Sequence, residues 1–172
     1  TTQMPGQLHG AGNTTTLAHY LELLAGVGLL VGLPKFAGGV VRQRGSSPKL
    51  QVLNTALLTA QSGLTPDEAR ADRDFRGRLV ESAVGAHLAN AAAAGTCEVY
   101  CWRDGNREVD FVVKAGRCVT AIEVKSGRRR ESLSGLAAFS DAHKPHRSLL
   151  VGADGSALEE FLARPVAHSV GS

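Results

Sequence analysis

The chain has 172 residues, of which 43% are hydrophobic and 20% charged, with a formal net charge of +3 and a pI near 9.0. This composition is typical of a soluble globular protein with one domain, or one domain and a small appendage. The basic excess is compatible with nucleic acid but too small to indicate it. The apolar run at residues 23–33 is too short to span a bilayer, and no signal peptide is recognised, so we expect a cytoplasmic protein without membrane contact.

The chain contains three cysteines, an odd number, and the spacing of Cys97 and Cys101 does not match a zinc site. We interpret them as small buried hydrophobic residues in a reducing compartment rather than as disulfide partners or metal ligands.

Residues 1–45 predict a small N-terminal segment. After an irregular start, a helix is expected from Thr14 to Leu24, ended by Gly26 and Gly28. Residues 29–36 and 40–44 are expected to form a hairpin around Gly38-Gly39. A helix followed by a β-ribbon is typical of the second half of a winged-helix unit. The alternative is a helix and hairpin that only pack on the main domain, since the helix carries few basic residues.

Residues 46–172, which begin at a Ser-Ser-Pro break, predict an α/β domain. Strands are expected at residues 49–54, 98–102 and 148–153, and helices at 55–61, 79–94, 133–143 and 157–165. The charged stretch 65–78 is expected to be a solvated loop or a helix start. With the hairpin described next, the order helix, three strands, helix, strand, helix predicts a mixed sheet with helices on its faces.

The hairpin at residues 106–127 carries the candidate site. Its apolar strands, 109–114 and 118–125, flank a turn for which we predict Ala115 and Gly116 as central residues. With period-two alternation, Asp110 shares a face with Glu108, Val112 and Lys114. Glu123 then becomes the diagonal neighbour of Asp110, about 7–8 Å away. Lys125 shares the face of Glu123.

Two carboxylates at this separation suit a hard divalent cation. We expect Asp110 and Glu123 to bind Mg²⁺, with Mn²⁺ as a substitute, and the backbone carbonyl of Val124 to act as a third ligand. Lys125 would position the attacking water or stabilise the transition state, and Glu81 would contribute from the preceding helix. The alternative is that these residues form structural ion pairs, with Glu81 favouring the helix dipole.

These residues resemble the motif of the PD-(D/E)xK nuclease superfamily: Glu81 in RLVESAVGAHL, Asp110 in EVDFVV, and Glu123 and Lys125 in IEVKSG. Together with SPKLQVLNTALL and VYCWRDGNREVDFVV, the blocks resemble a prokaryotic family. In that family, a nuclease-like C-terminal domain of unknown function follows an AAA+ ATPase module and a winged-helix segment.

The resemblance implies a restriction-endonuclease-like fold and Mg²⁺-dependent hydrolysis of phosphodiester bonds in DNA. It also implies an ATPase module in the same full-length chain. No G-x-x-x-x-G-K-[ST] loop occurs here, so we expect a fragment of a longer protein. Asn54 stands where an acidic residue is expected, which leaves a metal role for that position in doubt.

The basic run Arg128, Arg129 and Arg130 follows the EVK strand directly. We expect it to hold the DNA backbone through salt-sensitive, sequence-independent contacts, with a solvated basic run as the alternative. Two rival functions stay open: a catalytically inactive module of the same fold that binds DNA or regulates a fused ATPase, and a protein-interaction domain.

Overall fold

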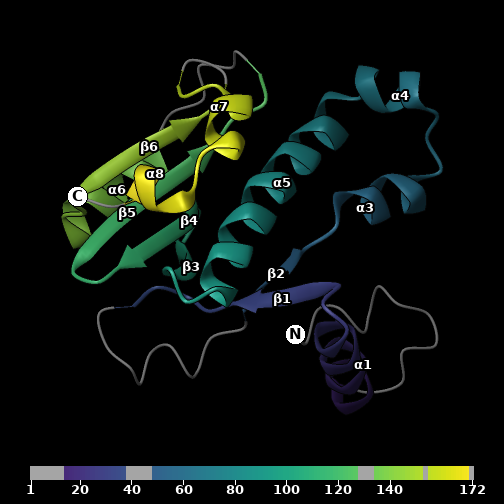
Figure 1. Ribbon diagram of the computed structural model, residues 1–172, viewed down its shortest axis with the longest axis horizontal. Coiled ribbons are helices and arrows are strands. Elements are labelled where there is room, and N and C mark those ends of the chain that lie inside the picture. Colours follow the sequence, from purple (N-terminus) through teal and green to yellow (C-terminus); the bar gives the residue numbers. More distant parts are fainter. Residues whose placement is uncertain (1–13, 38–47, 128–133, 153–154, 171–172) are drawn as a thin grey trace.

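The larger part of the molecule is built on a four-stranded mixed sheet, here called the central sheet, which lies at the left of Figure 1. The computed structural model describes residues 14–37, 48–127, 134–152 and 155–170. The strands lie in the order β3 (Glu98–Asp104), β4 (Arg107–Ala115), β5 (Cys118–Val124) and β6 (Arg147–Val151). β3, β4 and β5 are antiparallel, whereas β6 runs parallel to β5. The predicted mixed α/β sheet is therefore confirmed.

Helices cover both faces of this sheet. On one face lie α5 (Arg73–Ala93), α7 (Leu158–Ala163) and α8 (Val166–Val170), the last of which the sequence did not predict. On the other face lies α6 (Ser134–His143). Phe111 and Ile122 are fully buried on the α5 side, and Val112 and Phe139 on the α6 side. Burial on both faces explains why β4 and β5 are nearly continuous apolar runs.

α5 begins earlier than the sequence predicted, at Arg73 rather than at residue 79. The side chain of Asp72 accepts a hydrogen bond from the Phe75 N–H and so caps the first turn. Just before it, α4 (Pro66–Ala71) starts with a capping box between Thr65 and Glu68. Of the two expectations for residues 65–78, a solvated loop or a helix start, the second is the better one, because the stretch holds α4 and the start of α5 and its polar residues supply the helix caps.

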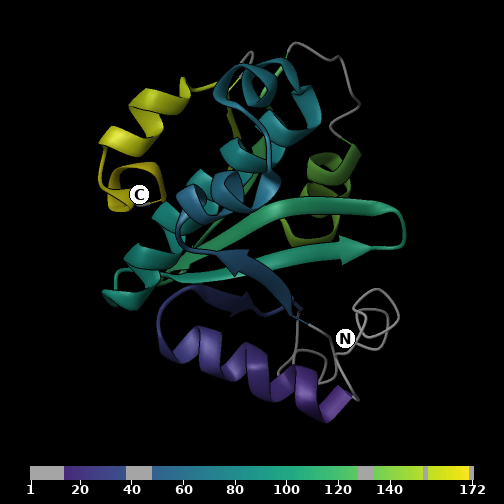
Figure 2. The ribbon, with the colours of Figure 1, turned by 90° about the vertical axis from the view of Figure 1, so that its right-hand side faces the viewer.

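The N-terminal part consists of α1 (Thr14–Gly26), β1 (Leu30–Leu33), β2 (Lys49–Val52) and α3 (Thr55–Ser62). β1 pairs antiparallel with β2; the expected strand at residues 40–44 lies outside the described residues. Figure 2 shows α1 on the far side of this ribbon from the central sheet. Leu17 is buried, but Tyr20 is 53% and Leu24 39% exposed, so much of the apolar surface of α1 is open. The winged-helix segment and the boundary at residue 45 stay predictions.

The hairpin of β4 and β5 is confirmed, but its turn lies one residue later than expected. Ala115 pairs with Cys118, which makes Gly116 and Arg117 the central residues. Gly116 has φ of 60°, and a two-residue turn of type II′ requires glycine at this first central position. Val112 consequently pairs with Ala121, and the regular pairing ends at Phe111 and Ile122, so the register that made Asp110 and Glu123 diagonal neighbours was wrong.

All three cysteines are free and partly buried. Within the described ranges, no helix combines the length and the apolar character needed to cross a membrane.

Candidate functional site

Asp110 lies in a β-bulge. β3 and β4 pair as Tyr100–Val112 and Trp102–Val109, so the single residue Cys101 faces two residues of β4, Asp110 and Phe111. A bulge changes the direction in which side chains point, and bulges are common next to functional sites. The expectation that Asp110 shares a face with Val112 was wrong for this reason. Val112 packs on the α6 side, whereas Asp110 lines a pocket together with Glu81 of α5.

The Asp110 carboxylate lies at the point where β4 and β5 separate. The regular pairing of these strands ends at Phe111 and Ile122. Beyond it, Asp110 Oδ2 accepts a hydrogen bond of 2.9 Å from the Val124 N–H, in place of a main-chain partner. A backbone N–H lies in the plane of the sheet, so the carboxylate occupies the gap between the two strands.

Glu123 approaches the same gap from β5. Its neighbours Ile122 and Val124 belong to the core on the α5 side, so alternation directs Glu123 towards the other face. The residue is only 9% exposed. Its Oε1 lies 2.8 Å from the Lys125 Nζ, while its Oε2 is buried and has no hydrogen-bond partner within the described part of the chain.

The carboxylates act on one another electrostatically. Burial raises the pKa of Asp110 to about 7, and the negative charges of Glu123 and Glu81 add to this effect. The Val124 N–H and the Lys49 ammonium lower the pKa of Asp110, but by less than the other effects raise it. Asp110 is therefore part of a crowded, poorly solvated group of negative charges.

Lys49 of β2 is a site residue that the sequence reasoning missed. Its ammonium forms an ion pair with Glu81, and it lies 5.0 Å from the centre of the Phe111 ring. Burial alone would lower the pKa of Lys49, but Glu81, Asp110 and Glu108 together raise it above its usual value, so the side chain stays charged. The sequence signal was slight, namely polar Lys49 and Gln51 alternating with Leu50 and Val52 in a short strand.

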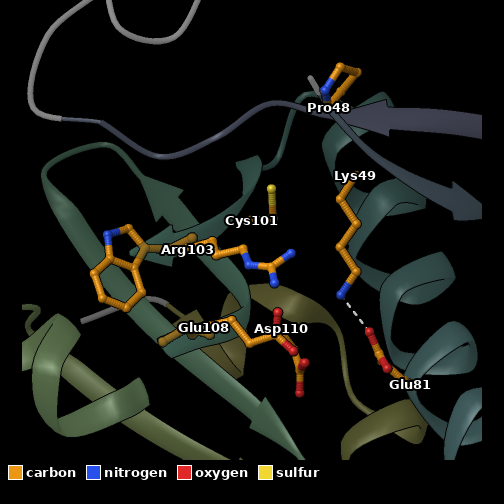
Figure 3. Close-up of a pocket in the computed structure, with 9 residues that line it drawn as sticks. Pro48, Lys49, Glu81, Cys101, Arg103, Glu108 and Asp110 are labelled. Carbon is orange, nitrogen blue, oxygen red and sulfur yellow. Dashed lines mark hydrogen bonds and ion pairs between the residues drawn. The ribbon is translucent and has the colours of Figure 1, made fainter. Parts of the chain in front are cut away.

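These groups line a pocket of about 410 Å³ between β2, β3, β4 and α5. Its charged lining comprises Lys49, Glu81, Arg103, Glu108 and Asp110. Figure 3 shows the side chains of Lys49 and Arg103 reaching from different walls towards the space next to the carboxylates. Glu123 and Lys125 are not part of this lining and lie at the adjoining end of β5.

All four predicted catalytic residues thus have defined positions. Asp110 and Glu123 meet at the end of the β4–β5 pairing, Lys125 is ion-paired with Glu123, and the charge of Glu81 acts on Asp110. Predicted DNA contacts at residues 128–130 lie outside the described residues. Among the residues that are described, no three His, Cys, Asp or Glu side chains form a group suited to hold a metal ion.

Asn54 has a structural role. Its side chain accepts a hydrogen bond of 3.0 Å from the Ala56 N–H and caps α3. Asparagine and aspartate are about equally favourable at an N-cap, so asparagine in place of an acidic residue does not reduce the stability of α3.

A family model described as "Domain of unknown function (DUF4143)" matches residues 76–163, which include α5 from Arg76 onwards, the whole central sheet and α7. No curated protein and no solved structure matches the chain.

Proposed function

The chain belongs to the DUF4143 family of domains of unknown function, and we propose that it hydrolyses phosphodiester bonds in DNA in an Mg²⁺-dependent reaction. In this proposal the mixed sheet and its flanking helices are a restriction-endonuclease-like fold. Asp110, Glu123 and Lys125 then correspond to the PD-(D/E)xK motif. DNA and a fused AAA+ module are the partners that the proposal implies.

One observation carries the proposal: the buried Glu123 carboxylate and the half-buried Asp110 carboxylate lie where the paired strands β4 and β5 separate, and one Glu123 oxygen has no partner in the described part of the chain. Glu123 Oε2 is buried without a hydrogen bond in the described part of the chain, beside the perturbed Asp110 carboxyl. A buried carboxylate oxygen without a donor is unfavourable unless a proton or a cation satisfies it. Oxygen donors alone suit Mg²⁺, which commonly uses only one or two carboxylates and otherwise keeps its waters.

The backbone supports a third oxygen at the same place. Lys125 N–H donates to Val151 of β6, so the neighbouring Val124 directs its N–H towards β4, where Asp110 accepts it. The N–H and C=O of one strand residue point to the same side. The Val124 carbonyl therefore faces the gap that also holds the Asp110 carboxylate.

Each side chain then has a role in hydrolysis. Bound Mg²⁺ would supply a water of lowered pKa and offset charge on the phosphoryl oxygens. Lys125, held by Glu123 at 2.8 Å, would position the attacking water and stabilise the negative charge of the transition state. Glu81 would orient water from α5 while its ion pair with Lys49 fixes its rotamer.

The test is cleavage of supercoiled plasmid and linear duplex DNA by the protein with Mg²⁺ or Mn²⁺. We expect cleavage to fall by about 10²–10³-fold in Asp110→Asn and in Lys125→Met. Glu98→Gln is the matched control, because Glu98 is an exposed carboxylate paired with Lys114 on the same sheet, and it should cleave normally. Cleavage that persists at the wild-type rate in both site variants would refute the proposal.

One observation favours the alternative, a catalytically inactive module that binds DNA or regulates a partner. Glu81 and Glu123 are each ion-paired with a lysine, Lys49 and Lys125, as expected of structural ion pairs. If the protein binds DNA without cleaving it, and Asp110→Asn binds equally well, this second function is the correct one. If it neither binds nor cleaves, a protein-interaction domain is favoured.

A further inference from the structure

The pocket on the α5 side of the site carries two cations on different elements. Lys49 comes from β2, and Arg103 comes from β3. An ammonium has three N–H donors and a guanidinium five. Glu81 accepts from Lys49, and the Gly105 carbonyl accepts from Arg103 Nε at 3.4 Å. Both groups therefore retain donors that can reach an oxygen-rich ligand.

Each of these cations has a carboxylate neighbour and still faces the pocket. Lys49 forms an ion pair with Glu81, and Arg103 is the cross-strand partner of Glu108 in the β3–β4 pairing. Figure 3 shows both cationic ends turned towards the interior of the pocket. At about 410 Å³, the pocket falls within the range of about 300–1,000 Å³ that is typical of ligand sites.

We propose that Lys49 and Arg103 bind a phosphate of the DNA backbone adjacent to the one that is cleaved, an inference that rests on the proposed function. The phosphate lies between the two cationic groups and takes their remaining N–H donors. Glu81 holds the Lys49 ammonium in position through their ion pair. Lys49 and Arg103 are thus positioning residues, which fix the register of the backbone relative to Asp110 and Glu123.

Binding at this place depends on a divalent ion. Glu81, Glu108 and Asp110 border the same pocket and repel an anion when they are ionised. A cation held by Asp110 and Glu123 reduces that repulsion, so phosphate and metal favour each other's binding. Because such coupling is reciprocal, DNA raises the affinity for the ion by the same factor.

The test is equilibrium binding of a short fluorescein-labelled DNA duplex, measured by anisotropy over a salt series with Ca²⁺ as the divalent ion. Lys49→Met and Arg103→Met should each weaken binding and reduce the slope of log K against log salt by about 0.9. Lys114→Met is the matched control: it removes a lysine that is also ion-paired with a glutamate, Glu98, at the opposite end of β4. Its binding should match the wild type.

Loss of Lys49 leaves Glu81 without its partner, so Lys49→Met/Glu81→Gln is measured as well, with the thermal transition of each variant as a check on folding. Lys49→Arg keeps the charge and should retain most of the binding. Wild-type affinity and an unchanged salt slope in folded Lys49→Met and Arg103→Met would overturn the inference, as would absence of wild-type binding.

Cleavage assays separate this inference from the proposed function. If wild-type protein cleaves DNA with Mg²⁺ and the two methionine variants cleave with an unchanged KM, the phosphate site is wrong and hydrolysis stands. If the variants lose binding while the wild type binds but never cleaves, the phosphate site stands and hydrolysis is wrong.

Discussion

Asp110 combines a structural and an electrostatic role within one side chain. Its Oδ2 replaces a main-chain acceptor for the Val124 N–H, which holds β5 in place where the strand pairing ends. The same carboxyl is crowded by Glu123 and Glu81, so its ionisation is unfavourable. An ionisable carboxyl at this position costs stability, so we do not expect it at a position that serves the fold alone.

At the scale of this residue we predict a pH-dependent gain of stability in Asp110→Asn. The folded pKa of about 7 lies above the usual aspartate pKa of 3.8, so the folded state binds more protons than the unfolded state between these values. The contribution of Asp110 to wild-type stability therefore falls as pH rises from about 4 to 7, by up to about 4 kcal/mol. Asparagine keeps an acceptor for the Val124 N–H but carries no charge.

The measurement is urea unfolding over a pH series with EDTA present. The variant should be more stable than wild type at about pH 8, and the difference should shrink towards about pH 4. Asp104→Asn, which changes an exposed carboxylate paired with Arg107, should show no such trend. A difference that stays constant with pH would show that Asp110 is not perturbed as described.

Among the elements, the contact of β2 with α5 decides where Lys49 lies. Gln51, only 3% exposed, donates to the Ser82 carbonyl at 3.0 Å. A Cβ at Gly85 would lie 2.0 Å from Gln51 Oε1 and 2.8 Å from Phe111 Cζ. We predict that Gly85→Ala destabilises the protein by about 1–3 kcal/mol in urea unfolding, because it forces the strand off the helix.

The control for this contact is Gly77→Ala in the same helix. Within the described part of the chain, a Cβ there meets only Ser126 Oγ, at 3.3 Å. The free energy of unfolding should change by less than about 1 kcal/mol, since alanine also favours the helix. Equal losses in the two variants would mean that helix propensity, not the approach of Gln51, determines the result.

The start of α5 supports a second prediction at this scale. Asp72→Ala removes the acceptor for the Phe75 N–H and should lower the free energy of unfolding by about 1 kcal/mol. Asp67→Ala removes an exposed carboxylate that pairs with Arg70 in α4 and should change it by less. An Asp67→Ala loss as large as that of Asp72→Ala would indicate a general charge effect instead of capping.

The sequence sufficed for elements that have a local signal. The apolar runs of β4 and β5 and the glycine between them predicted the hairpin, and the order of strands and helices predicted the mixed sheet. Features that depend on contacts between residues far apart in the sequence could not be predicted from the sequence. The bulge at Asp110 depends on pairing with Cys101, and Lys49 meets Glu81 across 32 residues of sequence. For the charged stretch at residues 65–78 the sequence left a loop and a helix start open, and it did not single out Asp72 as the N-cap of α5.

Considered as a whole molecule, the site joins parts that lie far apart in the chain. The β1–β2 ribbon contributes Lys49, α5 contributes Glu81, and the central hairpin contributes Asp110, Glu123 and Lys125. The sheet is buried on both faces, so polar groups concentrate where β4 and β5 separate. This arrangement provides a rigid frame for two carboxylates and leaves one side open to the charged pocket.

Calorimetric titration of the metal-free protein with Mg²⁺ or Mn²⁺ at about pH 7 tests most directly whether Asp110 and Glu123 share a cation. We predict saturable binding that releases protons, so the measured heat depends on the ionisation enthalpy of the buffer. Asp110→Asn and Glu123→Gln should abolish the binding, and Glu98→Gln should retain it. No binding by the wild type, or wild-type affinity in Asp110→Asn, would contradict the account.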